Sequence, residues 1–128
     1  MADTEKITIN LGVVDLGKID LLVEQGFYTN RTDFIRNAIR TNLDKHETTV
    51  QETVNRKSSV VGVMIYDAGD LEKRRVKGEK IDFHIIGMLV LGNDITPELA
   101  RETINSIKVL GIFDAPEDVK LALADRIL

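Results

Sequence analysis

The chain has 128 residues, no cysteine and a formal net charge of −4 at pH 7. The lack of cysteine excludes disulfide bonds and thiolate metal sites, and no apolar run reaches the roughly 18 residues that suggest a membrane span. The first five residues are polar and acidic, so we expect no signal peptide and a cytoplasmic protein. This length suits one compact domain or two small ones.

The first predicted element is a short strand, Lys6–Leu11. Its apolar face consists of Ile7, Ile9 and Leu11, and its polar face consists of Lys6, Thr8 and Asn10. No second strand follows nearby, so a lone strand would leave backbone N–H and C=O groups unpaired along both edges. The same strand from a second copy, running antiparallel, would satisfy one edge. The resulting ribbon would present a polar face suited to the major groove of DNA.

Two amphipathic helices are predicted after this strand. The first covers roughly Val13–Gln25, and Gly26 stands where a left-handed residue commonly closes a helix. Thr29-Asn30 supplies good N-cap residues for the second helix. That helix is predicted to continue past His46 and to end near residues 55–57. Its apolar stripe, expected in the core or at a dimer interface, consists of Phe34, Ile35, Ala38, Ile39 and Leu43.

The order of these elements matches a known pattern. Residues 5–45 closely resemble the ribbon-helix-helix (CopG/Arc/MetJ-like) DNA-binding domain. The specific part is Gly26–Arg36, which reads Gly-Phe-Tyr-Thr-Asn-Arg-Thr-Asp-Phe-Ile-Arg and lies one helix after Lys6–Leu11. The resemblance implies an intertwined homodimer that binds double-stranded DNA. It also implies a prokaryotic regulator of transcription, which we expect to be a repressor.

The resemblance assigns base contacts to Lys6, Thr8 and Asn10. Lysine can donate to guanine O6 and N7, asparagine can pair bidentately with adenine, and threonine offers a hydroxyl and a methyl group. The family often has arginine at one or two of these positions, so its target sequences do not carry over. The alternative interpretation is an ordinary solvated strand face.

The start of the second helix is the predicted phosphate-binding site. Backbone N–H groups at a helix N-terminus are unpaired and lie at the positive end of the helix dipole. Thr29, Asn30 and Arg31 would surround that point with a hydroxyl, an amide and a guanidinium group. Such contacts fix the position of a protein on DNA without reading sequence. The alternative is that Thr29 only caps the helix and Arg31 stays in solvent.

The charge balance opposes nucleic-acid binding, because DNA-binding proteins are usually basic. Residues 1–57 hold eight lysines and arginines against nine acids, and residues 58–128 hold nine against twelve. In the proposed dimer Lys6, Arg31 and Arg36 would gather near DNA, while Asp20 and the other acids of the first helix could face away. We therefore expect few phosphate contacts, with tight binding through several dimers side by side.

The overall prediction is an α+β protein in three parts. Residues 1–47 form the DNA-binding domain, residues 48–57 a helix extension or linker, and residues 58–128 a small α/β domain of about three strands and two helices. The strands are predicted at Val60–Tyr66 (a buried strand), Asp82–Leu91 and Ile107–Phe113, and the helices at Pro97–Ile104 and Pro116–Ile127.

A short internal repeat supports parallel strands in the second domain. Ile86-Gly87-Met88 recurs as Leu110-Gly111-Ile112, and the crossover of about fifteen residues between them suits a parallel βαβ unit. Asp67–Asp70 is predicted to be a turn. The charged segment Leu71–Lys80 is predicted to be a solvated loop or short helix, with a second contact to DNA or to an acidic partner as the alternative.

The second domain is expected to assemble dimers into a tetramer or larger oligomer, or to sense a ligand. The layout also resembles the nickel-responsive repressors, whose second domain binds metal and forms tetramers. A nickel site requires several imidazoles and a thiolate, whereas this region offers only His84, which we expect to be a hydrogen-bonded core residue. We therefore predict neither a metal nor a cofactor. His46 is expected on a solvated helix face.

A repressor is not the only class of function that the sequence allows. The alternative is a ribbon-helix-helix antitoxin whose C-terminal domain binds a toxin, and a small toxin gene directly downstream would favour it. An enzyme is not predicted, because no nucleophile–base pair, acid–base pair or Gly-rich phosphate loop occurs at a recognisable spacing. The sequence leaves open whether the second domain binds a small ligand, a toxin or only another copy.

Overall fold

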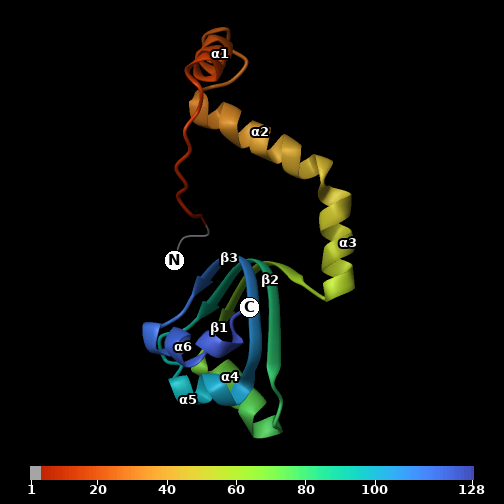
Figure 1. The fold of residues 1–128 in the computed structure, drawn as a ribbon, viewed down its shortest axis with the longest axis vertical. Helices are drawn as coiled ribbons and strands as arrows, with labels where there is room; N and C mark the ends of the chain where they lie inside the picture. Colours follow the sequence, from red (N-terminus) through yellow and green to blue (C-terminus); the bar gives the residue numbers. More distant parts are fainter. Residues whose placement is uncertain (1–3) are drawn as a thin grey trace. The chain divides into compact units, whose positions relative to one another are not determined.

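The computed structural model describes residues 4–128, which form two compact units (Figure 1). The first unit extends to Glu52, and the second runs from Thr53 to Leu128. The elements are α1 (Val13–Glu24), α2 (Arg31–Lys45), α3 (Glu47–Lys57), β1 (Val60–Tyr66), α4 (Ala68–Lys77), β2 (Ile81–Leu91), α5 (Pro97–Thr103), β3 (Ile104–Asp114), α6 (Glu117–Ala122) and a 3-10 turn at Ala124–Arg126. Helix α3 contributes residues to both units.

Helix α1 ends as its sequence predicts. Gly26 has a φ of +85°, in the left-handed region that glycine adopts without a steric penalty. Its N–H donates to the carbonyl of Val23, and the N–H of Phe27 donates to the carbonyl of Leu22. These two bonds form a Schellman-type closure. They turn the chain toward α2.

The predicted long second helix is interrupted. Helix α2 ends at Lys45, and His46 has a φ of −105° and donates its N–H to the carbonyl of Leu43, which tightens the last turn. Helix α3 then begins at Glu47. The prediction of one helix continuing past His46 was therefore wrong at this residue. The apolar stripe that supports α2 thins out after Leu43, so little packing holds the helix straight there.

The second unit contains a three-stranded sheet in the order β1-β2-β3. Both neighbouring pairs are parallel, with Val60 beside Ile85 and Ile85 beside Val109. This confirms the three predicted strands and the parallel pairing expected from the internal repeat. Short crossovers through α4 and α5 make this possible, because parallel neighbours cannot be joined by a tight hairpin.

Helices α4, α5 and α6 gather on one face of the sheet (Figure 1). They contribute the fully buried side chains Leu71, Ala100 and Val119, respectively. These pack with buried strand residues that point to the same face, namely Phe83, Ile85, Leu89, Leu91, Ile104 and Ile107. One apolar core therefore lies between the sheet and a single layer of helices.

The opposite face of the sheet is open in the single chain. Because side chains alternate along a strand, Val61, Val63 and Ile65 of β1 point away from the helices. Val63 is 44% exposed and Ile65 is 67% exposed, and Leu110 of β3 is also exposed. The prediction that Val60–Tyr66 is a buried strand was therefore wrong about burial, although its boundaries are confirmed.

A row of glycines crosses the middle of the sheet. Gly62, Gly87 and Gly111 are register partners on the three strands, and all have positive φ, at 141°, 135° and 124°. A Cβ on Gly87 would lie 2.2 Å from the carbonyl oxygen of Gly62, and one on Gly111 would lie 2.0 Å from that of Gly87. The repeat noted in the sequence thus marks Gly87 and Gly111, the two positions of this row where the neighbouring backbone approaches too closely for a side chain, whereas a Cβ on Gly62 would meet no atom within 4 Å.

Two other predictions for the second unit were wrong. Asp67–Asp70 is the start of α4 rather than a turn: Asp67 accepts from the N–H of Asp70 at 2.8 Å, and Asp70 accepts from the N–H of Asp67 at 3.0 Å. This reciprocal capping box begins a helix. The unit therefore has α4 in addition to the two predicted helices, and α4 confirms the short-helix alternative for Leu71–Lys80. The last one is also shorter than predicted, because α6 ends at Ala122 and a 3-10 turn follows.

Candidate nucleic-acid interface

The predicted base-reading segment lies at the start of the first unit. Residues 4–12 have no strand partner within the described chain, and Lys6, Thr8 and Asn10 are exposed on an extended segment (Figure 1). No backbone hydrogen bond joins residues 4–11 to another described segment, and α1 follows directly. The ribbon itself needs a second copy, so the pairing and the base contacts stay predictions.

The apolar residues of the first unit also lack cover within one chain. In the described part of this unit, Ile19 of α1 is the one buried hydrophobic residue. Ile7 is 73% exposed, and Ile39 and Leu43 on the apolar stripe of α2 are about half exposed. Tyr28 packs edge-on against Phe34 with ring centroids 5.0 Å apart. The predicted strand Lys6–Leu11 is extended but not a strand in the single chain, because it has no partner to pair with. This segment and the uncovered stripe are the features that an intertwined partner would bury.

Asn30, not Thr29, caps α2. The Asn30 side-chain oxygen accepts from the N–H of Asp33 at 2.8 Å, while the Thr29 N–H donates to the Asp33 carboxylate at 3.0 Å. The interpretation in which Thr29 caps the helix was therefore wrong. Within residues 4–128 the amides of Arg31 and Thr32 have no acceptor, so two N–H groups at this helix start remain available to an anion.

Arg31 is paired inside the chain. Its guanidinium donates to both oxygens of Asp20 on α1, with Nε–Oδ1 at 2.8 Å and Nη2–Oδ2 at 2.9 Å. The hydrogen bond and the charge of Arg31 lower the pKa of Asp20, and Asp20 in turn raises the pKa of Arg31. Asp20 therefore lies beside Arg31, one of the basic residues predicted at the DNA face. Any phosphate contact by Arg31 must therefore share the guanidinium with Asp20. Because its pKa is lowered, the Asp20 carboxylate stays ionised at lower pH than an ordinary aspartate does.

We expect Arg31→Ala to weaken binding to any DNA sequence and to reduce the slope of log K against log salt by about 0.9, the value for one phosphate contact. Asp20→Asn is the matched control, because it removes the ion pair but keeps the guanidinium. The slope should stay the same or become steeper in that variant. Both slopes can be measured by fluorescence anisotropy on random duplex DNA. An unchanged slope in Arg31→Ala would show that Arg31 makes no phosphate contact and only joins α1 to α2.

His84 does not occupy the position predicted for it. It is half-buried on the open face of the sheet rather than in the core, and its register partner on β3 is Lys108. Among the described residues, no group of three or more histidine, aspartate or glutamate side chains is arranged to hold a metal ion. No helix in residues 4–128 has the length and apolar character needed to cross a membrane.

A comparison with known protein families gives a match to this chain. The model of the family described as Ribbon-Helix-Helix transcriptional regulator family matches residues 2–120. The match therefore includes both the N-terminal helices and most of the parallel sheet domain. No match to this chain was found among curated proteins or among solved structures.

Proposed function

Because the chain belongs to the ribbon-helix-helix transcriptional regulator family, we propose that it is a sequence-specific DNA-binding repressor that acts as a homodimer in the cytoplasm. Two copies of residues 6–11 would pair into an antiparallel ribbon that enters the major groove. Lys6, Thr8 and Asn10 would then contact base edges. The observation that carries this proposal is the exposed, unpaired segment before α1, together with the uncovered apolar stripe of α2.

The start of α2 would position this ribbon on the DNA backbone. The free amides of Arg31 and Thr32 point from a helix N-terminus, where a phosphate is favoured. Thr29 and Asn30 flank them, and Asn30 already holds the first turn in place through Asp33. The Asp33 carboxylate lies close to the same helix end, which fits weak rather than strong non-specific binding. This matches the acidic balance of the chain.

A direct test is to recover the genomic DNA fragments that the full-length protein retains and to measure its mass in solution. The expected result is a short palindrome upstream of a gene, bound by a dimer or by an even-numbered oligomer, because a two-fold ribbon reads two-fold sites. A monomer, or a fragment set without a shared sequence, would contradict the proposal.

We further propose that the second unit joins dimers through the open face of its sheet. Sheets made only of parallel strands are normally covered on both faces, yet here three helices cover one face and, within residues 4–128, only the end of α3 reaches the other. The open face carries apolar rows in register, including Val63, Met88 and Ile112 across the three strands. The same face of another copy is a fitting cover, since the ribbon would already bring copies together.

We expect the double variant Val63→Lys and Ile65→Lys to reduce the protein from a tetramer or larger oligomer to a dimer, because burying two unpaired ammonium groups is unfavourable. Val76→Lys is the control, since Val76 is 75% exposed, more than Val63 or Ile65, but lies on α4, away from the open face. Sedimentation equilibrium measures the masses. An unchanged mass in the double variant would contradict self-association through this face, and a wild-type dimer that instead binds a co-expressed toxin there would favour the antitoxin alternative.

A further inference from the structure

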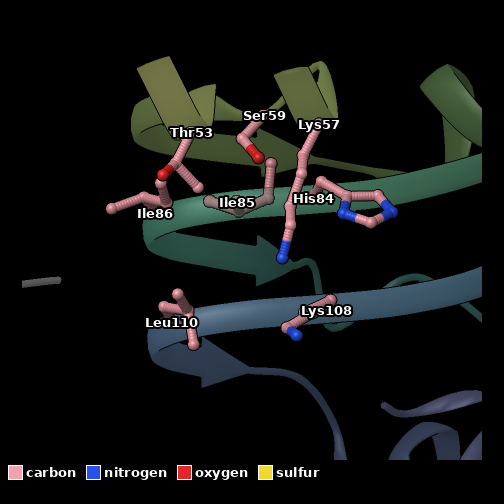
Figure 2. A pocket seen from close by; sticks show the side chains of 8 residues that line it. All are labelled: Thr53, Lys57, Ser59, His84, Ile85, Ile86, Lys108 and Leu110. Atoms are coloured by element: carbon pink, nitrogen blue, oxygen red, sulfur yellow. The ribbon is translucent and has the colours of Figure 1, made fainter. Parts of the chain in front are cut away.

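A small hollow lies at one end of the open face, where the last turns of α3 meet β2 and β3. Its volume is about 60 Å³, and it is lined by Thr53, Lys57, Ser59, His84, Ile85, Ile86, Lys108 and Leu110. All of these residues belong to the second unit. Figure 2 shows the Lys57 side chain running from α3 across β2 with its ammonium group toward β3, beside the ring of His84 and above Lys108.

The charges around this hollow have one sign. Its lining includes two lysines and a histidine and no carboxylate. Lys57, His84 and Lys108 come from three separate elements, so the fold and not local sequence brings them together. Like charges placed together repel one another unless an anion lies between them. In a chain with a net charge of −4, a hollow with this lining is a specific feature and not a general property of the surface.

An acid on the same face, Asp82, is already engaged. Asp82 precedes His84 by two residues on β2, and its carboxylate accepts hydrogen bonds from Ser106 at 2.6 Å and Asn105 at 2.9 Å. These bonds, with a smaller effect from the charge of His84, lower the pKa of Asp82. Asp82 therefore has partners of its own on β3 and is not part of the lining of the hollow.

The size and the lining together define the ligand. A hollow of about 60 Å³ has room for a few water molecules or one compact ion. Lysine ammonium groups and the Ser59 hydroxyl are donors for oxyanions. Ile86 and Leu110 form an apolar side to the hollow that suits a short hydrocarbon group beside the charge.

We propose that this hollow binds a compact oxyanion, a phosphate or a short-chain carboxylate. Lys57 and Lys108 supply the charge, and Ser59 and His84 supply further hydrogen bonds. Lys57 lies on α3, the helix that continues into the DNA-binding unit. If the chain is the proposed repressor, the anion would act as its effector by tying the end of α3 to the sheet. The binding site itself does not depend on that function.

The chain allows a direct spectroscopic test, because it has only two histidines, His46 and His84. Inorganic phosphate, and separately acetate, is titrated into the full-length protein at constant pH and ionic strength, without DNA. The ring proton signals of both histidines are followed by NMR, and the His84→Gln variant identifies them. The expected result is a saturable shift of the His84 signal with no change at His46. Comparing the two titrations shows whether a phosphate or a carboxylate is preferred.

A matched pair of charge variants completes the test. Lys57→Gln with Lys108→Gln should weaken phosphate or acetate binding at least tenfold. Lys73→Gln with Lys77→Gln removes the same charge from α4, outside the lining of the hollow, and should leave the binding unchanged. Equal weakening in both pairs, or a shift that never saturates for either anion, would overturn the proposal.

The same variants distinguish an effector site from a second DNA contact. Their affinities for random duplex DNA are measured over a range of salt. The slope should be the same in the Lys57/Lys108 pair as in the wild type, because the proposed ligand is a small anion. A slope reduced only in that pair, together with no saturable binding of phosphate or acetate, would overturn the proposal and make the hollow a DNA contact. Failure of the wild type to bind DNA would contradict the proposed function. The anion titration would still test the binding site, because it is carried out without DNA.

Discussion

Gly87→Ala is expected to lower the stability of the second unit by about 3 kcal/mol or more. A non-glycine residue at positive φ costs about 1–3 kcal/mol, and overpacking in a close-packed structure costs about 1–3 kcal/mol more. Both apply at Gly87, whose φ is 135° and whose Cβ would lie 2.2 Å from the carbonyl oxygen of Gly62. Since that atom belongs to the backbone, relief requires the two strands to separate.

The neighbouring glycines separate the two effects. Gly62 has a similar φ of 141°, but an added Cβ there meets no atom within 4 Å. Gly62→Ala should therefore show only the conformational cost. Gly111→Ala should behave like Gly87→Ala, since its Cβ would lie 2.0 Å from the Gly87 oxygen. Gly17→Ala, inside α1 and in open space, should stabilise that helix by about 0.5–1 kcal/mol.

Thermal unfolding monitored by near-ultraviolet circular dichroism measures these differences in the second unit, because Tyr66 packs edge-on against Phe83 inside it. A loss of about 3 kcal/mol corresponds to a fall in Tm of roughly 12–24 °C for a domain of this size. If Gly87→Ala proved no less stable than Gly62→Ala, the close approach of the strands would not be what requires glycine there.

Asn10→Ala is expected to reduce discrimination between the operator and random DNA by about 1–3 kcal/mol, which is roughly 5- to 150-fold. The reason is that an asparagine side chain can donate to and accept from adenine at once, and alanine can do neither. Asn10 is exposed on the segment that would form the ribbon. The affinity for random DNA should change little, because a base contact adds nothing to binding through phosphates.

Competition between operator and random duplexes, measured at one salt concentration, provides both affinities. Asn42→Ala is the control, since Asn42 is also exposed but donates to the Ala38 carbonyl on α2. It should leave discrimination unchanged. Equal losses of affinity for both DNAs in Asn10→Ala would show that Asn10 does not recognise a base. The polar face of this segment would then be an ordinary solvated surface.

The sequence by itself determined the elements whose information is local. The continuous apolar, β-branched run of residues 60–66 and the repeated Ile-Gly-Met and Leu-Gly-Ile segments located the strands, because the composition of a few consecutive residues is enough to indicate a strand. Gly26 marked the end of α1, since a left-handed closure needs glycine at one defined place. The family resemblance of residues 5–45 likewise rests on a local order of motifs, and the family match extends to residue 120.

Helix α4 shows where local information was insufficient. Its ten residues hold three basic side chains in the last turn and one fully buried residue, Leu71. Asp67 and Asp70 suit a turn as well as a capping box. The helix forms because Leu71 packs into the core between sheet and helices, and the pattern in the sequence does not reveal that core.

The tertiary structure alone decided which residues from distant segments meet. Asp20 and Arg31 are eleven positions apart and pair only because the turn after Gly26 folds α2 back onto α1. Gly62 joins the glycine row only through strand register. Lys57, His84 and Lys108 gather at one hollow because parallel crossovers place β2 and β3 side by side beneath the end of α3. Periodicity describes which face a residue occupies, whereas these contacts depend on which other segment covers that face.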